Sequence, residues 1–64
     1  LTAVFTAADN TDKEYPLTVA LYNLKGLNAI GLGDSAGAKA HFEKALELAP
    51  DFQMAKDNLA SLEN

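Results

Sequence analysis

The sequence has no cysteine and no tryptophan, only two prolines, and five lysines and arginines against nine aspartates and glutamates among its 64 residues. Without cysteine there is no disulfide and no thiolate metal site, so neither can reinforce a core that is small at this length. The net charge of −4 argues against a nucleic-acid surface, which needs a basic excess, and against docking on anionic lipid.

Long apolar runs are also missing. The least charged stretch, residues 15–33, is interrupted by Lys25, asparagines and glycines, whereas a membrane-spanning helix needs about 20 mostly apolar residues. Residues 1–8 carry no basic segment and are too short for the apolar part of a signal peptide. We therefore expect one domain over residues 1–64 that does not span a membrane. Because the sequence starts at Leu1, we expect a fragment or a processed product, and nothing in it indicates a cellular location.

What the sequence does contain is helical periodicity in segments separated by short turns. Pro16 suits the first turn of a helix, Gly33 suits a helix end, and Asp34 or Ser35 suits the cap of the next helix. The first segment depends only on apolar residues at Leu1, Val4, Phe5 and Ala8. The predicted fold class is all-α, built of antiparallel helical hairpins, with helices at residues 1–9, 16–32, 35–48 and 53–63.

Two of these helices have contrasting faces. Residues 17–32 are apolar nearly all round, which is typical of a helix packed on both sides. Residues 36–48 are amphipathic, with Phe42 on one side and charged residues on the other.

The sequence repeats itself with a period near 34 residues. Pro16 and Pro50 share that spacing, and at a spacing of 35 Ala20, Asn23, Leu24 and Leu27 meet the identical residues Ala55, Asn58, Leu59 and Leu62. With two helices per period, and with the pattern A-x3-F-x2-A-x4-P present as Ala38, Phe42, Ala45 and Pro50, the chain resembles the tetratricopeptide repeat. The turn at residues 33–34 and the small Gly26 fit the same pattern, whereas Lys25, Ala29 and Ser35 depart from it.

The resemblance implies a piece of an α–α superhelix in three parts. Residues 1–15 would be the end of a preceding repeat plus a loop, residues 16–50 one complete repeat, and residues 51–64 the first or capping helix of the next. Within the complete repeat we expect the two helices to cross closely at small residues. The predicted contacts are those of Ala38, Phe42 and Ala45 with Tyr22, Gly26 and Ala29.

The resemblance also implies a protein-interaction scaffold that binds a peptide or partner protein on the concave face of the array. The implied binding residues are Ala20, Asn23, Leu27, Ile30, Phe52 and Asn58. The two asparagines would hydrogen-bond a partner's backbone, while Phe52 would lie either at the rim of the groove or under the next helix. The alternative is a structural or accessory segment of a larger protein with no ligand of its own. Self-association, or packing against the rest of a longer chain, would cover the apolar N-terminal residues.

Residues 33–37 match G-x-S-x-G, the nucleophile motif of serine hydrolases. That motif has meaning only between a strand and a helix, with an acid and a histidine much later in the chain. Here a helix is expected before it, and the single histidine, His41, follows Ser35 by six residues. A lone histidine without cysteine is also a poor metal site. We therefore expect no catalytic residue, no metal and no cofactor.

Overall fold

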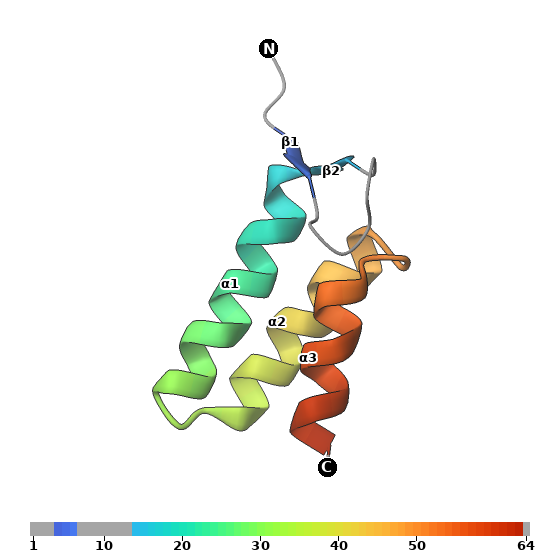
Figure 1. The fold of residues 1–64 in the computed structure, drawn as a ribbon. Helices are drawn as coiled ribbons and strands as arrows, with labels where there is room; N and C mark the ends of the chain where they lie inside the picture. Colours follow the sequence, from blue (N-terminus) through green and yellow to red (C-terminus); the bar gives the residue numbers. More distant parts are fainter. Residues whose placement is uncertain (1–3, 7–13, 64) are drawn as a thin grey trace.

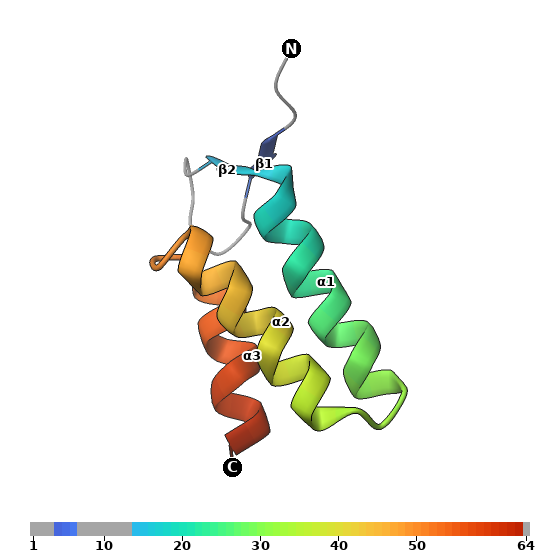
Figure 2. The same cartoon turned by 180° about the vertical axis from the view of Figure 1, so that it is seen from behind.

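The computed structural model describes residues 4–6 and 14–63, and the molecule is a helical hairpin against which a third helix packs (Figure 1). The helices α1 and α2 run antiparallel, and α3 lies mainly against α2 (Figure 2). A short two-stranded sheet lies at the N-terminal end of α1. The all-α hairpin predicted from the sequence is confirmed. In chain order the elements are β1 (Val4–Thr6), β2 (Glu14–Pro16), α1 (Leu17–Gly31), α2 (Ser35–Leu48) and α3 (Gln53–Glu63).

The three main helices begin and end within one residue of their predicted limits, and the turn between α1 and α2 shows why. Gly33 has a φ of 79°, the left-handed conformation that glycine adopts without a steric penalty. Its N–H donates to the carbonyl of Ile30 at 3.0 Å, and the N–H of Asp34 donates to that of Ala29 at 2.8 Å. These two bonds satisfy carbonyls that the end of a helix would leave without partners.

Asp34, and not Ser35, caps α2. The carboxylate of Asp34 accepts a hydrogen bond from the N–H of Gly37 at 2.9 Å, while Ser35 is the first residue of the helix. A Cβ at position 37 would overlap this carboxylate. The glycine that costs helix propensity therefore leaves space for the cap.

The helix predicted at residues 1–9 is wrong over residues 4–6, which form β1. This strand pairs antiparallel with β2, with Val4 opposite Pro16 and Thr6 opposite Glu14. Helical spacing over eight residues is weak evidence, and the β-branched and aromatic run of residues 4–6 favours a strand. Residues 4–6 are thus not the end of a preceding repeat's second helix, and residues 1–3 and 7–9 lie outside the described part.

The core consists of two clusters, one at each end of the hairpin. Phe42 is fully buried in one of them, and its ring lies so close to Gly26 that a Cβ there would be 2.6 Å from ring atom Cδ1. This confirms the predicted close crossing of α1 and α2. The first cluster joins Ala29, Ala38 and Phe42, with Leu59 and Leu62 of α3 against it. The second joins Tyr15, Val19, Ala45, Ala49, Phe52 and Ala55, with Tyr22 against it.

Candidate functional site

An apolar groove runs between α1 and the start of α3. Its cavity volume is about 300 Å³, and its walls are mostly leucine and alanine side chains of α1, with Met54 on the α3 side. Ala20 is half-buried in the groove and Leu27 is exposed along it. The complete lining is Leu17, Ala20, Leu21, Asn23, Leu24, Leu27, Phe52 and Met54.

Asn23 forms part of the floor of this groove, and it is tied to α3. Its Oδ1 accepts a hydrogen bond from Nδ2 of Asn58 at 2.9 Å, and only 4% of Asn23 is exposed. A side chain with so little exposed surface does not offer its amide to a partner's backbone. In this structure the two asparagines join α1 to α3, and direct bonding of a ligand by Asn23 stays a prediction.

Phe52 also lies under the groove and not at its rim. Its side chain is 0% exposed, and its ring packs edge-on against that of Tyr15, with centroids 4.8 Å apart and planes at 73°. Of the two roles considered for Phe52, packing beneath the next helix is the one found. Its contribution to the groove is to fix the apolar floor on which any occupant would lie.

The structure therefore brings four of the six expected residues to one groove: Ala20, Asn23, Leu27 and Phe52. Ile30 is exposed on α1, and Asn58 reaches the site only through its bond to Asn23. Sequence reasoning missed Leu17, Leu21, Leu24 and Met54. The signal for the three leucines was present in their helical spacing, but their apolar surroundings predicted a helix covered on both sides.

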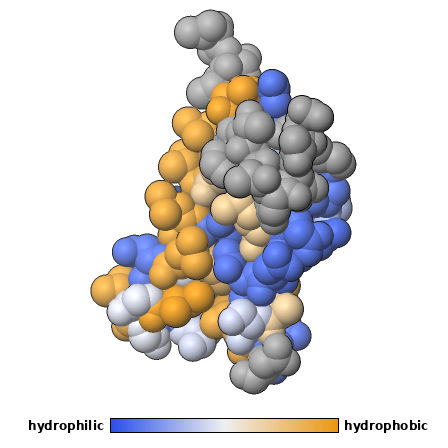
Figure 3. Space-filling view, viewed as in Figure 1, coloured by the Kyte–Doolittle hydropathy of each residue, from blue (hydrophilic) through white to orange (hydrophobic). Residues whose placement is uncertain are grey.

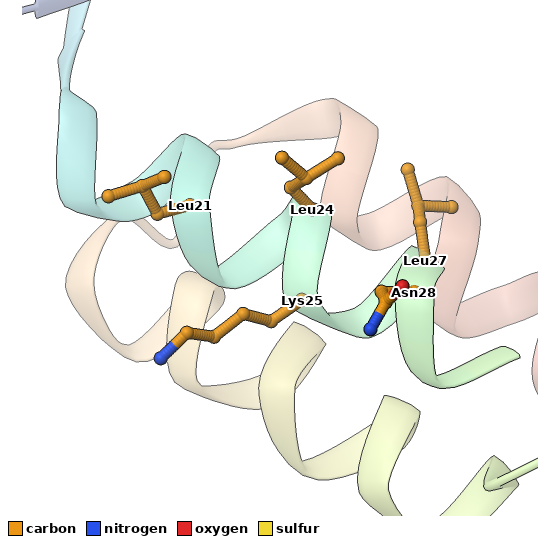
Figure 4. A pocket seen from close by; sticks show the side chains of 5 residues that line it. All are labelled: Leu21, Leu24, Lys25, Leu27 and Asn28. Atoms are coloured by element: carbon orange, nitrogen blue, oxygen red, sulfur yellow. The ribbon is translucent and has the colours of Figure 1, made fainter. Parts of the chain in front are cut away.

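The outer side of α1, which faces away from α2, is in fact uncovered by the described part of the chain. Figure 3 shows it as a band of apolar surface along α1. In Figure 4, Leu24 and Leu27 point to the α3 side of the helix, and Lys25 extends along the other side. The ammonium group of Lys25 lies 5.2 Å from the centre of the Tyr22 ring, within the range of a cation–π contact. Lys25 is the single charged residue of α1.

The residues that suggested other chemistry lie in ordinary structural positions. Ser35 is exposed at the start of α2, after a helix and a turn and not after a strand. His41 is half-buried on α2, and the described residues contain no group of three or more histidine, cysteine or acidic side chains placed to hold a metal ion. Among the same residues, no helix combines the length and the apolar character needed to cross a membrane.

Comparison with known proteins identifies the hairpin. The family model of the tetratricopeptide repeat matches residues 19–52, which are 34 of the chain's 64 residues and cover most of α1, all of α2 and the turn into α3. Neither the curated proteins nor the solved structures that were compared gave a match. Members of this family are protein-interaction modules and are typically not catalytic. The chain belongs to the tetratricopeptide repeat family.

Proposed function

We propose that the groove between α1 and α3 binds an amphipathic helix of a partner protein through apolar contacts. The observation that carries this proposal is the groove itself, an open apolar channel whose walls come from two helices. Protein interaction is the general role of the family, and four of the residues that the resemblance assigns to the concave face line this groove.

A helical partner fits the groove better than an extended one. An extended peptide needs hydrogen bonds for its backbone, because unpaired N–H and C=O groups are costly to remove from water. The two amides nearest the floor, Asn23 and Asn58, are bonded to each other. A helix satisfies its own backbone and presents apolar side chains at i, i+3, i+4 and i+7, which suits walls made of Leu24, Leu27 and Met54.

Charge narrows the class of partner further. The whole chain carries a net charge of −4, so a strongly acidic partner would be repelled at long range. The groove itself is lined by no charged residue, since Lys25, the one charged residue of α1, extends along the other side of that helix. The best-matched helix is therefore close to neutral overall and presents an uncharged apolar face.

The test uses a defined probe: a 16-residue peptide of Leu, Ala, Glu and Lys with leucines at helical spacing, and a scrambled peptide of the same composition. Binding is followed through the amide resonances of the 15N-labelled chain. We expect the largest shift changes at Ala20, Leu27 and Met54, and none with the scrambled peptide. Shifts confined to the exposed face of α2 would contradict the proposal.

A matched pair of variants tests the groove directly. Leu27→Glu places a charge in the groove and should weaken binding of the leucine peptide about tenfold or more, equivalent to at least about 1.4 kcal/mol. Leu48→Glu makes the same change at a similarly exposed leucine of α2, outside the groove, and should bind as the parent chain does. Equal losses in both variants would show that the groove is not the binding site.

A further inference from the structure

The exposed side of α1 carries a regular stripe of residues, three of which (Leu17, Leu21 and Leu24) also line the proposed peptide groove. The stripe residues are Leu17, Leu21, Leu24, Asn28 and Gly31, all exposed and spaced alternately four and three residues apart. This 4–3 spacing is that of the a and d positions of two-stranded coiled coils, which keep one seam facing a partner helix. Leu24 is 61% exposed, so the described part of the chain leaves the centre of the stripe open to solvent.

We propose that a second copy of this chain covers the stripe, with the two α1 helices side by side and parallel. Asn28 is the residue that selects this orientation. In a parallel pair each Asn28 meets its counterpart, and the two amides can bond each other. In an antiparallel pair centred on Leu24, Asn28 would lie opposite Leu21 and lose its hydrogen bonds with water. A single asparagine at an a position is known to fix the register and the number of strands in this way, at a cost in stability.

Charge favours a second copy on this face over the exposed side of α3. The stripe contains no charged residue, and Lys25 beside it is the only charge on α1, so two chains of net charge −4 can approach here without opposing acidic groups. The exposed side of α3, by contrast, carries Gln53, Lys56, Asp57, Ser61 and Glu63. Pairing α1 of one copy with α3 of another would bury those polar groups, so the like-with-like arrangement is favoured.

α3, which follows α1 at the repeat spacing, is packed on the side that corresponds to the stripe. Thirty-four residues after Leu21, Ala55 of α3 is fully buried against the hairpin, and 34 residues after Asn28, Leu62 packs against the Phe42 cluster. The side of the helix that α3 buries is thus the side that α1 leaves open. On α3 that side packs mainly against α2; in the proposed dimer the second α1 takes the corresponding place against the first.

The size of the surface sets the expected strength. α1 has 15 residues and is about 22 Å long. A standard interface buries about 800 Å² per partner, roughly a fifth of the 4188 Å² exposed by this chain, and a single helix pair of this length buries less. We therefore expect a weak, reversible dimer with a dissociation constant of about 0.1 mM.

Sedimentation equilibrium of the chain from about 10 μM to about 1 mM tests the proposal. The average mass should rise from 6.8 kDa towards twice that value. Leu24→Glu should weaken dimerisation about a hundredfold, because it places two like charges at the centre of the seam, whereas Leu48→Glu should associate like the parent chain. Helical circular dichroism would establish that both variants are folded.

Asn28→Val supplies the decisive measurement, since it should change association in the opposite direction. Replacing the buried asparagine pair by valine should tighten association about tenfold or more and admit larger oligomers or the antiparallel pair. A chain that stays monomeric at about 1 mM would overturn the proposal, as would equal losses in Leu24→Glu and Leu48→Glu. Weaker association of Asn28→Val would overturn the parallel pairing. None of these outcomes depends on whether the leucine peptide binds.

Discussion

Nδ2 of Asn58 in α3 donates a hydrogen bond to Oδ1 of Asn23 in α1 at 2.9 Å, joining two residues 35 positions apart. Identical residues at that spacing were part of the sequence repeat, so the two members of the repeat bond each other. The bond is the one side-chain hydrogen bond between α1 and α3 that the described residues show. It therefore links α3 to α1 beneath the groove.

We predict that Asn23→Ala and Asn58→Ala each lower the free energy of unfolding by about 1–3 kcal/mol, since each leaves one amide without its partner. Asn23→Ala should be the more harmful, because Asn23 is almost fully buried and Asn58 only half-buried. The double variant should lose less than the sum of the two, with a coupling of about 0.5–3 kcal/mol. Urea denaturation of the four proteins measures this. Strict additivity would mean that the bond does not form in solution.

The close approach of Gly26 to Phe42 gives the second prediction. Gly26→Ala should lower the free energy of unfolding by about 1–3 kcal/mol, because its methyl group overlaps the ring of a fully buried residue. Gly31→Ala is the matched control: no atom lies within 4 Å of its Cβ position, so it should be neutral or stabilise by up to ~1 kcal/mol through helix propensity. In thermal melts, the melting temperature of Gly26→Ala should fall below that of the parent chain, whereas that of Gly31→Ala should stay the same or rise. Equal shifts would mean that the helices do not cross at Gly26.

The hairpin was predictable because its signals are local and agree with one another. Pro16 and Pro50 mark helix limits by their restricted backbones, and Gly33 does so by its freedom to adopt a positive φ; those limits were predicted within one residue. The pattern of Ala38, Phe42 and Ala45 then placed the core, since small residues are needed where helices approach closely. The fold class and the packing of the two helices could thus be predicted from the spacing of residues close in sequence.

Contacts between distant residues were harder to predict. Residues 4–6 pair with residues 14–16, and eight residues with an apolar spacing could not distinguish that strand from a helix. Tyr15, from the segment before the repeat, packs on the fully buried Phe52, and no repeat pattern includes that contact. The exposure of the α1 stripe to solvent could not be predicted either, because the sequence of a helix that is apolar all round does not show which of its sides is covered.

The cap of α2 gives the third prediction, that the effect of Gly37→Ala depends on whether Asp34 is present. Asp34→Ala should lower the free energy of unfolding by about 0.5–2 kcal/mol by removing the acceptor for the N–H of Gly37. Gly37→Ala alone should be nearly neutral, because the ~1 kcal/mol gain in helix propensity is offset by displacing the Asp34 carboxylate. In the Asp34→Ala background the carboxylate is gone, and Gly37→Ala should stabilise by about 1 kcal/mol.

Urea denaturation of the two single variants, the double variant and the parent chain measures this dependence. Ser35→Ala serves as a control, since Ser35 is exposed and is not the capping residue; it should change stability by less than about 0.5 kcal/mol. If Ser35→Ala were as damaging as Asp34→Ala, the cap would be assigned to the wrong residue.

The last prediction concerns Tyr15, which lies outside the 19–52 family match yet is 5% exposed in the core. Its ring packs edge-on against Phe52, and its hydroxyl donates to the carbonyl of Asp51 at 3.3 Å. Tyr15→Phe should cost about 1 kcal/mol, the value of the hydroxyl bond, whereas Tyr15→Ala should cost about 3–5 kcal/mol by leaving a cavity beside Phe52. Leu17→Ala, at a nearby exposed residue, should cost less than about 1 kcal/mol. If Tyr15→Ala melts with the parent chain, residues 14–16 are not part of the folding unit; if it melts as predicted, the stable domain extends beyond the repeat that the family pattern defines.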